Sequence, residues 1–326
     1  MNALITGGAG LIGSHFVDHL LTETDQDIHI VDNFSTGRRS NIEHTLANER
    51  VEIDDVDVRE TEEMHQAVSR ADIVYHFAAA LGVERIVDNP LSSLQTNIRG
   101  TENILDAAAK DGTPVFVASS SEVYGKSPDL PFSEEDDCVL GPTSVPRWGY
   151  ATAKAIDEFY AFAHHAENDL PIVVGRFFNT VGPRQVGDYG MVIPTFVERA
   201  LADEPIQVYG DGTQTRSFTH VRDAVKVVRD LMNTPNTDGD VFNIGSSESI
   251  SINELAEQII LVTDSNSKIE HVPFAEVFEE DFEEPRHRKP DVSKLRETIG
   301  WAPETSLNQI IEDVVDAQQS GAEVPT

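Results

Sequence analysis

The stretch Thr6-Gly7-Gly8-Ala9-Gly10-Leu11-Ile12-Gly13 decides the fold of this chain. It follows a short strand-like run, residues 3–6, and opens a segment with helical spacing. Glycines at these intervals permit a tight turn and a close approach of the backbone to a pyrophosphate. The N-terminus of the next helix then offers free N–H groups to the phosphates. The stretch predicts a dinucleotide-binding unit, whereas the glycines alone are also compatible with a tight turn that binds nothing.

The first half of the chain repeats this order of strand and helix. Short β-branched runs alternate with helical stretches, and this alternation predicts a parallel, doubly wound sheet with right-handed crossovers. The expected strands are residues 3–6, 28–32, 51–54, 73–76, 115–119 and 172–176. The expected helices are residues 11–21, 62–69, 91–110 and 151–166.

Beyond about residue 180 the rhythm loosens. A helix is expected over residues 193–201, with Pro194 in its first turn, and a strand over residues 241–244 is expected to return to the sheet. The fold class is therefore α/β: a Rossmann doubly wound parallel sheet with a smaller C-terminal α/β substrate-binding domain. The expected domains are residues 1–178 with a returning segment near 215–262, and residues 179–214 with 263–326.

The composition limits the partners of the chain. A formal net charge of −33, from 57 acidic and 24 basic residues, repels nucleic acid and anionic membranes, so neither is expected as a partner. The acids are spread along the chain, which favours a salt-adapted surface over a disordered tail. No apolar run is long enough for a membrane span, and no signal peptide is recognisable. Because Cys138 is the only cysteine, no internal disulfide is possible, and a cytoplasmic protein is expected.

The cofactor expected at the glycine loop is NAD. Asp32 ends the second expected strand, roughly twenty residues beyond the glycines. An acid there accepts hydrogen bonds from the adenosine ribose and repels a 2′-phosphate, which favours NAD over NADP. Arg38 and Arg39 follow closely and weaken this preference. The other residues expected near the adenosine are Asn33, Asp57 and Val58.

Tyr150 and Lys154 form the expected catalytic pair. They lie four residues apart at the start of a predicted helix and so share one face. The ammonium favours the phenolate, so we expect a lowered tyrosine pKa, as suits a general base. The alternative is an ordinary exposed Tyr–Lys pair. Residues 119–125, SSSEVYG, end the fifth strand. Their hydroxyls either cap a turn or join the pair in handling protons.

Together these motifs resemble the extended short-chain dehydrogenase/reductase family, in its NAD-dependent sugar-nucleotide epimerase/dehydratase branch. The resemblance covers nearly the whole chain. The motifs that carry it are the glycine loop, YHFAAA at 75–80, SSSEVYG at 119–125, Tyr150 with Lys154, RFFN at 176–179, YGDGTQTR at 209–216 and RHRKPD at 286–291.

The resemblance implies a role for each site residue. Tyr150 takes the proton of the sugar 4-hydroxyl as hydride passes from C4 to NAD, Lys154 binds the nicotinamide ribose, and Ser120 bonds the same hydroxyl. The expected catalytic residues are Tyr150, Lys154, Ser120 and Glu122. The expected cofactor contacts are Gly7, Gly10, Leu11, Ile12, Gly13, Asp32, Asn33, Asp57, Val58, Phe77, Ala78, Ala79, Asn97, Ser119, Tyr150 and Lys154.

The expected substrate is a nucleotide-sugar, UDP-linked, whose diphosphate needs fixed cations in so acidic a protein. By the resemblance, Asn179 and Arg216 contact the diphosphate, with Arg286 or Arg288 near it. Arginine grips phosphate oxygens with paired donors, although Arg216 and Arg286 have the alternative of pairing with nearby acids. The expected substrate contacts are Val83, Ser120, Glu122, Asn179, Val192, Tyr209, Arg216 and Arg288. No metal is expected.

The reaction expected first is 4-epimerisation of a UDP-hexose of the UDP-glucose/UDP-galactose type, through a 4-keto sugar. Residues 182–185, 191–194 and 208–212 look most like 4-epimerases. The alternative is decarboxylation of UDP-glucuronate to UDP-xylose, since residues 120–122 and 288–290 resemble decarboxylases. Ser121 disfavours a 4,6-dehydratase, and the intact serine, tyrosine and lysine disfavour a non-catalytic NAD-binding protein.

A homodimer is expected by the same resemblance, through the helices 91–110 and 151–166. The second helix carries Ile156, Phe159, Tyr160 and Ala163 at helical spacing, which predicts a core stripe. Phe162 lies off that stripe and is available for a second interface.

Overall fold

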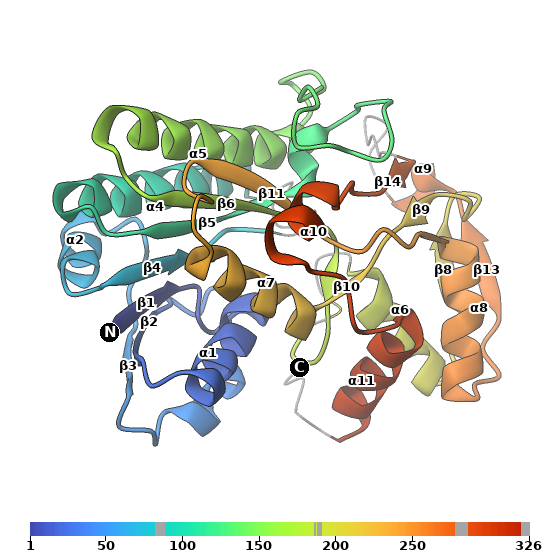
Figure 1. Ribbon diagram of the computed structural model, residues 1–326. Helices are drawn as coiled ribbons and strands as arrows, with labels where there is room; N and C mark the ends of the chain where they lie inside the picture. Colours follow the sequence, from blue (N-terminus) through green and yellow to red (C-terminus); the bar gives the residue numbers. More distant parts are fainter. Residues whose placement is uncertain (82–88, 186, 188–190, 278–285, 321–326) are drawn as a thin grey trace.

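A seven-stranded parallel sheet forms the larger part of the molecule (Figure 1). The structure, a computed structural model, describes residues 1–81, 89–185, 187, 191–277 and 286–320. The strand order is β11-β6-β5-β4-β1-β2-β3. The strands are β1 (Asn2–Thr6), β2 (Asp27–Val31), β3 (Val51–Asp54), β4 (Ile73–His76), β5 (Val115–Ser120), β6 (Ile172–Phe177) and β11 (Asp240–Ile244). The expected α/β class and the return of residues 241–244 to the sheet are confirmed, because β11 pairs with β6 in parallel.

Helices cover both faces of this sheet (Figure 1). On one face α2 (Thr61–Ser69), α4 (Pro90–Asp111) and α5 (Arg147–Asn168) bury Met64, Ile104 and Ala161 in one apolar cluster. On the other face α1 (Leu11–Glu23) and α7 (Val221–Asn233) bury Phe16 and Val228 in a second cluster. A doubly covered parallel sheet of this kind presents the carboxyl ends of its strands as the ligand crevice.

The buried face of α5 differs from the predicted one. Phe159, expected in the core stripe, is 73% exposed, whereas Phe162 is partly buried against the α2–α4–α5 cluster. The helix instead turns Lys154, Asp157 and Glu158 inward, all of them buried. The predicted stripe was therefore wrong at Phe159, although Tyr160 packs against the cluster as expected. Apolar spacing alone could not show that the fold buries polar groups of this helix.

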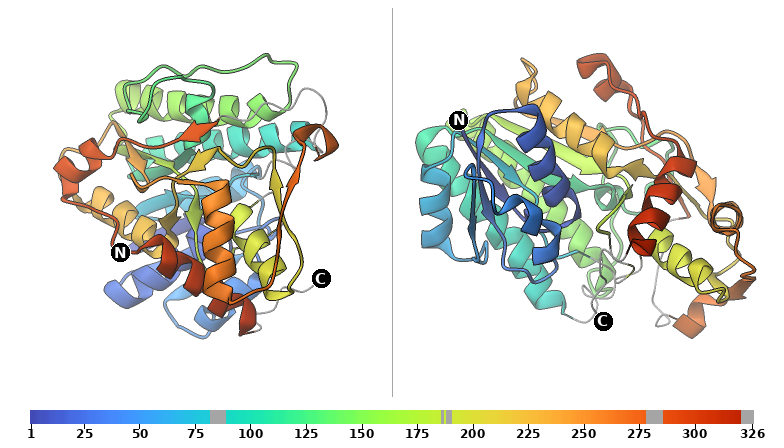
Figure 2. Two further views of the ribbon diagram at one scale, coloured as in Figure 1. Left: turned by 90° about the vertical axis from the view of Figure 1, so that its right-hand side faces the viewer. Right: turned by 90° about the horizontal axis from the view of Figure 1, so that it is seen from below.

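A smaller part of the molecule lies beyond the carboxyl ends of the strands (Figure 2), and it has an apolar cluster of its own. This cluster joins α6 (Val192–Leu201), α8 (Ile252–Thr263) and α11 (Leu307–Gln319), and beside it β8 (Ile206–Tyr209) pairs with β13 (Ile269–Val272). Pro194 lies in the first turn of α6, as expected. The division into domains stays a proposal: α7 and β11 lie with the large sheet, but α8, which falls in the expected returning segment, packs with α6 and α11.

The remaining elements of the described residues are short. They are β7 (Thr180–Val181), β9 (Thr215–Arg216), β10 (Thr219–His220), β12 (Ile250–Ser251), α9 (Phe274–Val277), β14 (His287–Arg288), α10 (Ser293–Ile299) and the 3₁₀ turns η1 (Arg39–Asn41), η2 (Glu43–Thr45) and η3 (Ser121–Tyr124). The strand β9 lies between β12 and β14 in a small sheet, which sets Arg216 beside Arg288 in register. Among the described residues, no helix is long and apolar enough to cross a membrane.

Candidate active site

A cavity of about 920 Å³ runs along the carboxyl ends of the strands and continues beneath the smaller cluster. Such a volume suits a cofactor together with a second ligand. The expected site residues that line it are Gly7, Gly10, Leu11, Ile12, Gly13, Asp32, Asn33, Val58, Phe77, Ala78, Ala79, Ser119, Ser120, Glu122, Tyr150, Lys154, Asn179, Val192, Tyr209, Arg216 and Arg288. Asp57 and Asn97 are described but do not line it, and Val83 lies outside the described residues.

Two positions of the glycine loop, Gly7 and Gly13, leave no room for a side chain. A Cβ at Gly7, where φ is +70°, would lie 2.7 Å from the Ala78 nitrogen, and one at Gly13 would lie 2.2 Å from the Gly7 carbonyl oxygen. Backbone atoms therefore form this wall of the cavity, at the N-terminus of α1. The loop fits a pyrophosphate, because main-chain N–H groups and the helix dipole are what such a group requires.

Asp32 is fixed at the end of β2 by two main-chain donors. Its carboxylate accepts hydrogen bonds from the Ala9 nitrogen and the Phe34 nitrogen, both at 2.8 Å. Burial outweighs these bonds and raises the pKa of the carboxyl above its usual range. The position at the cavity wall is the one expected of a ribose-binding acid.

Two of the expected cofactor residues, Asp57 and Asn97, do not line the cavity but bond to residues next to it. Asp57 accepts hydrogen bonds from Asn33 at 2.8 Å and from Arg59 at 2.6 and 2.9 Å, and the Arg59 bonds lower the pKa of Asp57 to about 2. Asn97, on α4, accepts from the Ala80 nitrogen at 2.7 Å and donates to its carbonyl at 3.1 Å. Both side chains therefore hold neighbouring segments in place: Asp57 holds Asn33, and Asn97 holds the loop after β4.

Tyr150 and Lys154 lie together under the end of β5. The Lys154 ammonium donates to the Ala118 carbonyl at 2.9 Å and to Asp157 at 3.1 Å, and the Ser120 hydroxyl is hydrogen-bonded to Tyr150. The predicted lowering of the Tyr150 pKa is not what the structure shows. Burial raises the pKa of Tyr150 by more than Lys154 lowers it.

The two serines at the end of β5, Ser119 and Ser120, have different surroundings. The Ser119 hydroxyl donates to Glu158 at 2.5 Å, and Glu158 in turn pairs with Arg176 at 2.7 Å. Ser119 lines the cavity, but its hydroxyl is directed into this buried pair. The Ser120 hydroxyl accepts from the Glu122 nitrogen at 3.3 Å, so it caps the η3 turn and also reaches Tyr150.

Glu122 lies between two arginines in the cavity wall. It accepts from Arg288 at 2.5 Å and from Arg147 at 3.3 Å. Burial opposes ionisation of the carboxyl, but Arg288 and Arg147 outweigh it and hold the pKa of Glu122 below its usual range. The group is therefore an ionised carboxylate presented together with two guanidinium groups.

Arg147 is a cavity residue that the sequence reasoning missed. It is the first residue of α5, which begins four residues before the predicted start and directly after Pro146. A proline commonly stands at the beginning of a helix, so Pro146 is the signal that places Arg147 in the first turn. From there Arg147 is three residues before Tyr150 and on the same helical face.

Beyond Glu122 the cavity is lined by groups from the second half of the chain. Arg216 is buried, lines the cavity and donates to the Arg286 carbonyl at 3.2 Å. Arg286 itself is exposed, and its guanidinium lies 3.7 Å from the Asp211 carboxylate. It therefore pairs with a nearby acid, which was the alternative to a role at the diphosphate. Asn179, Val192 and Tyr209 also line this end of the cavity. Of the arginines expected near the substrate, Arg216 and Arg288 therefore lie at the cavity wall.

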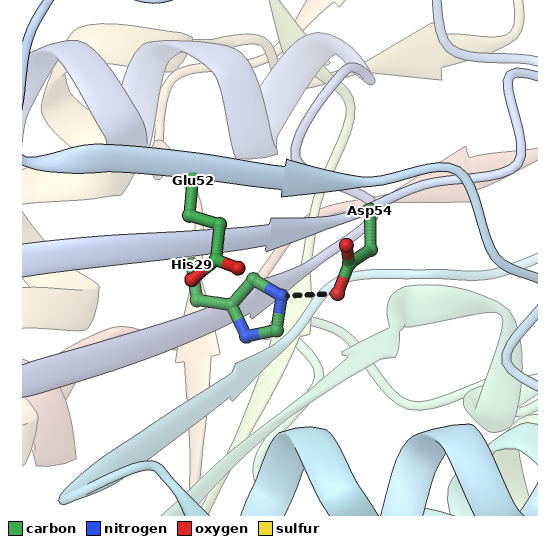
Figure 3. A group of neighbouring side chains, drawn as sticks. All are labelled: His29, Glu52 and Asp54. Carbon is green, nitrogen blue, oxygen red and sulfur yellow. Dashed lines mark hydrogen bonds and ion pairs between the residues drawn. The ribbon is translucent and has the colours of Figure 1, made fainter.

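A separate group of possible metal ligands lies at the edge of the sheet, away from the cavity. His29, Glu52 and Asp54 meet across β2 and β3, with His29 and Asp54 2.8 Å apart (Figure 3). Arg70 lies 3.6 Å from Glu52 and 3.8 Å from Asp54. Its guanidinium already supplies positive charge to these carboxylates, so the group has the character of an ion-pair cluster.

Comparison with known proteins places this site in a family. The family model described as GDP-mannose 4,6 dehydratase matches residues 4–314. A UDP-N-acetyl-alpha-D-glucosaminuronate decarboxylase from Bacillus cytotoxicus is 42% identical, over 96% of this chain and 96% of that protein. UDP-glucuronic acid decarboxylase 4 from Arabidopsis thaliana is 36% identical, over 95% of this chain and 66% of its own length.

A solved structure extends the comparison. UDP-glucuronic acid 4-epimerase from Bacillus cereus, in complex with UDP-glucuronic acid and NAD, has a TM-score of 0.86 and 28% identity, covering 98% of this chain and 99% of that one. The expected resemblance, the enzyme class and NAD as the cofactor are confirmed. The decarboxylases, our alternative, are supported better than the UDP-hexose 4-epimerase that we placed first.

Proposed function

The chain belongs to the GDP-mannose 4,6 dehydratase family, among the NAD-dependent epimerases and dehydratases of the extended short-chain dehydrogenase/reductase group, and from this premise we propose that it decarboxylates a UDP-linked hexuronate. The observation that carries the proposal is the contact of Glu122 with Arg288 and Arg147 beside Tyr150. A pocket for a neutral hexose has no need of two guanidinium groups, whereas a sugar carboxylate requires a cation.

The first half of the reaction belongs to Tyr150 and its neighbours. NAD, when bound, accepts and returns a hydride at C4 of the sugar. Tyr150 takes the proton of the 4-hydroxyl, Ser120 orients that hydroxyl, and the Lys154 ammonium stabilises the phenolate. Because burial raises the pKa of Tyr150, this stabilisation is needed before the phenol can act as a base.

The second half belongs to the charged end of the cavity. In the 4-keto sugar, the bond from C5 to the carboxylate breaks, its electron pair is delocalised toward the 4-keto oxygen, and carbon dioxide leaves. C5 then takes up a proton from solvent, and Tyr150 gives its proton back to the 4-oxygen when the 4-keto group is reduced. Arg288, with Arg147 nearby, provides the cation for the sugar carboxylate. Arg216 provides the cation for the diphosphate. Glu122, ionised between Arg288 and Arg147, holds these two guanidinium groups at the cavity wall.

Product analysis tests the proposal. The purified enzyme is given UDP-glucuronate, UDP-N-acetylglucosaminuronate, UDP-glucose and UDP-galactose separately, and products are identified by NMR with carbon dioxide measured in parallel. We expect carbon dioxide and a UDP-pentose product from a uronate, with no interconversion of the neutral sugars. Interconversion of UDP-glucose and UDP-galactose without carbon dioxide would overturn the proposal in favour of the 4-epimerase.

A second candidate is 4-epimerisation of the uronate itself. It is favoured by the similarity to the Bacillus cereus UDP-glucuronic acid 4-epimerase, whose carboxylated substrate would also require cations. The same experiment separates the two, because an epimerase converts UDP-glucuronate to UDP-galacturonate and retains the carboxylate.

A homodimer through α4 and α5 completes the proposal. Phe159 on α5 is 73% exposed and Leu91 on α4 is 68% exposed, and the two helices pack side by side. Exposed large apolar side chains on neighbouring helices support a contact with a second copy. Light scattering on the wild type should give the dimer mass, and Phe159→Lys should shift it toward the monomer.

A further inference from the structure

Asp157 is a buried acid that the proposed mechanism leaves without a role. It lies on α5 one turn beyond Lys154, and both side chains are buried, with Asp157 0% and Lys154 2% exposed. The Lys154 ammonium donates to Asp157 Oδ2 at 3.1 Å and to the Ala118 carbonyl at 2.9 Å. A carboxylate placed in such a site costs desolvation free energy unless a cation compensates it, so the two groups depend on each other.

The surroundings of Asp157 identify Lys154 as its principal cation. On its own helix the titratable neighbours are Tyr150 and Glu158, and the charge of Glu158 is taken up by Arg176 at 2.7 Å. From α4 the Thr101 hydroxyl lies beside the carboxylate and donates to the Asn97 carbonyl at 2.9 Å. From β4, His76 bonds Thr101 at 3.2 Å. Burial lowers the His76 pKa to about 3, so this ring is neutral.

We propose that Asp157 is a positioning residue of this active site, which fixes the Lys154 ammonium between its carboxylate and the Ala118 carbonyl and thereby sets the pH range in which the Tyr150–Lys154 pair is active. The inference rests on the roles given to Tyr150 and Lys154 in the proposed function. It does not depend on which sugar is the substrate.

The sign of the effect follows from electrostatics. An anion beside the pair stabilises the ammonium and destabilises the phenolate. Asp157→Asn keeps the shape and an acceptor oxygen but removes the charge, so both macroscopic pKa values of the coupled pair should fall. Because the active form carries a phenolate and an ammonium, both limbs of the kcat/KM profile should move to lower pH, by about one unit.

Two measurements test the proposal on the full-length protein. A ¹⁵N NMR titration of the lysine ammonium groups, with the Lys154 signal assigned by Lys154→Met, should show the Lys154 pKa about one unit lower in Asp157→Asn. This readout needs neither substrate nor turnover. The kcat/KM profile, recorded on whichever UDP-sugar the product analysis identifies, should shift in the same direction. The charge-matched control is Asp106→Asn, which changes an exposed acid of α4 that lies beside His164 of α5 and should leave both readouts unchanged.

The outcomes separate positioning from a merely structural role. A folded Asp157→Asn protein whose Lys154 titration and pH profile match the wild type would overturn the proposal, even if its melting temperature fell. If Asp157→Asn does not fold, Asp157→Glu decides. It keeps the charge but displaces the carboxylate by one methylene, so kcat should fall at least tenfold with KM little changed. A wild-type kcat in that variant would equally overturn the proposal. Absence of decarboxylation with a shifted Lys154 pKa would instead refute only the proposed reaction.

Discussion

The two ends of the cavity are built in different ways. The part of the cofactor end around the glycine loop and Asp32 comes from one stretch of chain, residues 6–80, and uses glycine backbone and an acid held by main-chain donors. The substrate end brings Glu122 to Arg288, 166 residues away in the sequence, and uses charged side chains. The cofactor end can bind the same cofactor whatever the substrate. We therefore expect the residues of the substrate end to determine which reaction the enzyme performs.

Tyr150→Phe should have the largest effect, because Tyr150 lies where the two ends meet. Loss of the hydroxyl removes the base but keeps the ring, so kcat should fall by about two to four orders of magnitude with NAD content unchanged. Steady-state kinetics and nucleotide analysis of the denatured protein measure this. Tyr160→Phe, ten residues further along α5 and outside the cavity lining, is the matched control and should behave as the wild type. Near-normal turnover in Tyr150→Phe would remove the catalytic assignment.

Arg288→Ala tests the substrate end alone. It removes the guanidinium group that pairs with Glu122 and that is the proposed cation for the sugar carboxylate. Carbon dioxide release should therefore fall about a hundredfold. NAD content should stay at the wild-type level. The control is Arg286→Ala, since that arginine is exposed and pairs with Asp211. If the two variants lose activity equally, or if Arg288→Ala also loses NAD, the separation of the two ends fails.

Asp32→Ala tests the cofactor end. Removing the acid should reduce the preference for NAD over NADP about tenfold, because repulsion of a 2′-phosphate is lost. Binding of each nucleotide to protein refolded without cofactor is compared by calorimetry. The exposed neighbour Asp55→Asn should retain the preference. Recovery of mainly NADP from the wild-type protein would show that Asp32 does not have this role.

The smallest effect expected concerns the surface that both ends share. A net charge of −33 produces self-repulsion that salt screens, so the melting temperature should rise by several degrees as potassium chloride approaches molar concentration. Near the sequence pI of about 4.5 the rise should be smaller, because the net charge is then close to zero. A flat or falling profile at neutral pH would contradict salt adaptation.

The sheet and the cofactor end were predictable because their signals are local. Each expected strand lies within a residue or two of an observed one, since β-branched runs bounded by turn residues have few alternatives in a buried parallel sheet. The helix α5 shows the limit of such reasoning. Its apolar residue Phe159 is exposed, while Lys154 and Asp157 are buried. Periodicity identifies an apolar face but not the polar groups that a fold buries to serve a site.

The sequence alone therefore determined the α/β fold, the glycine loop, Asp32 and the Tyr150–Lys154 spacing, because each depends on residues close together in the chain. Only the tertiary structure decided which cations meet Glu122, and that Arg147 is one of them. It also decided the Tyr150 pKa, since burial outweighs the neighbouring lysine, and it buried Asp157 and that lysine together. These depend on desolvation and on contacts between distant segments, which a linear pattern does not record.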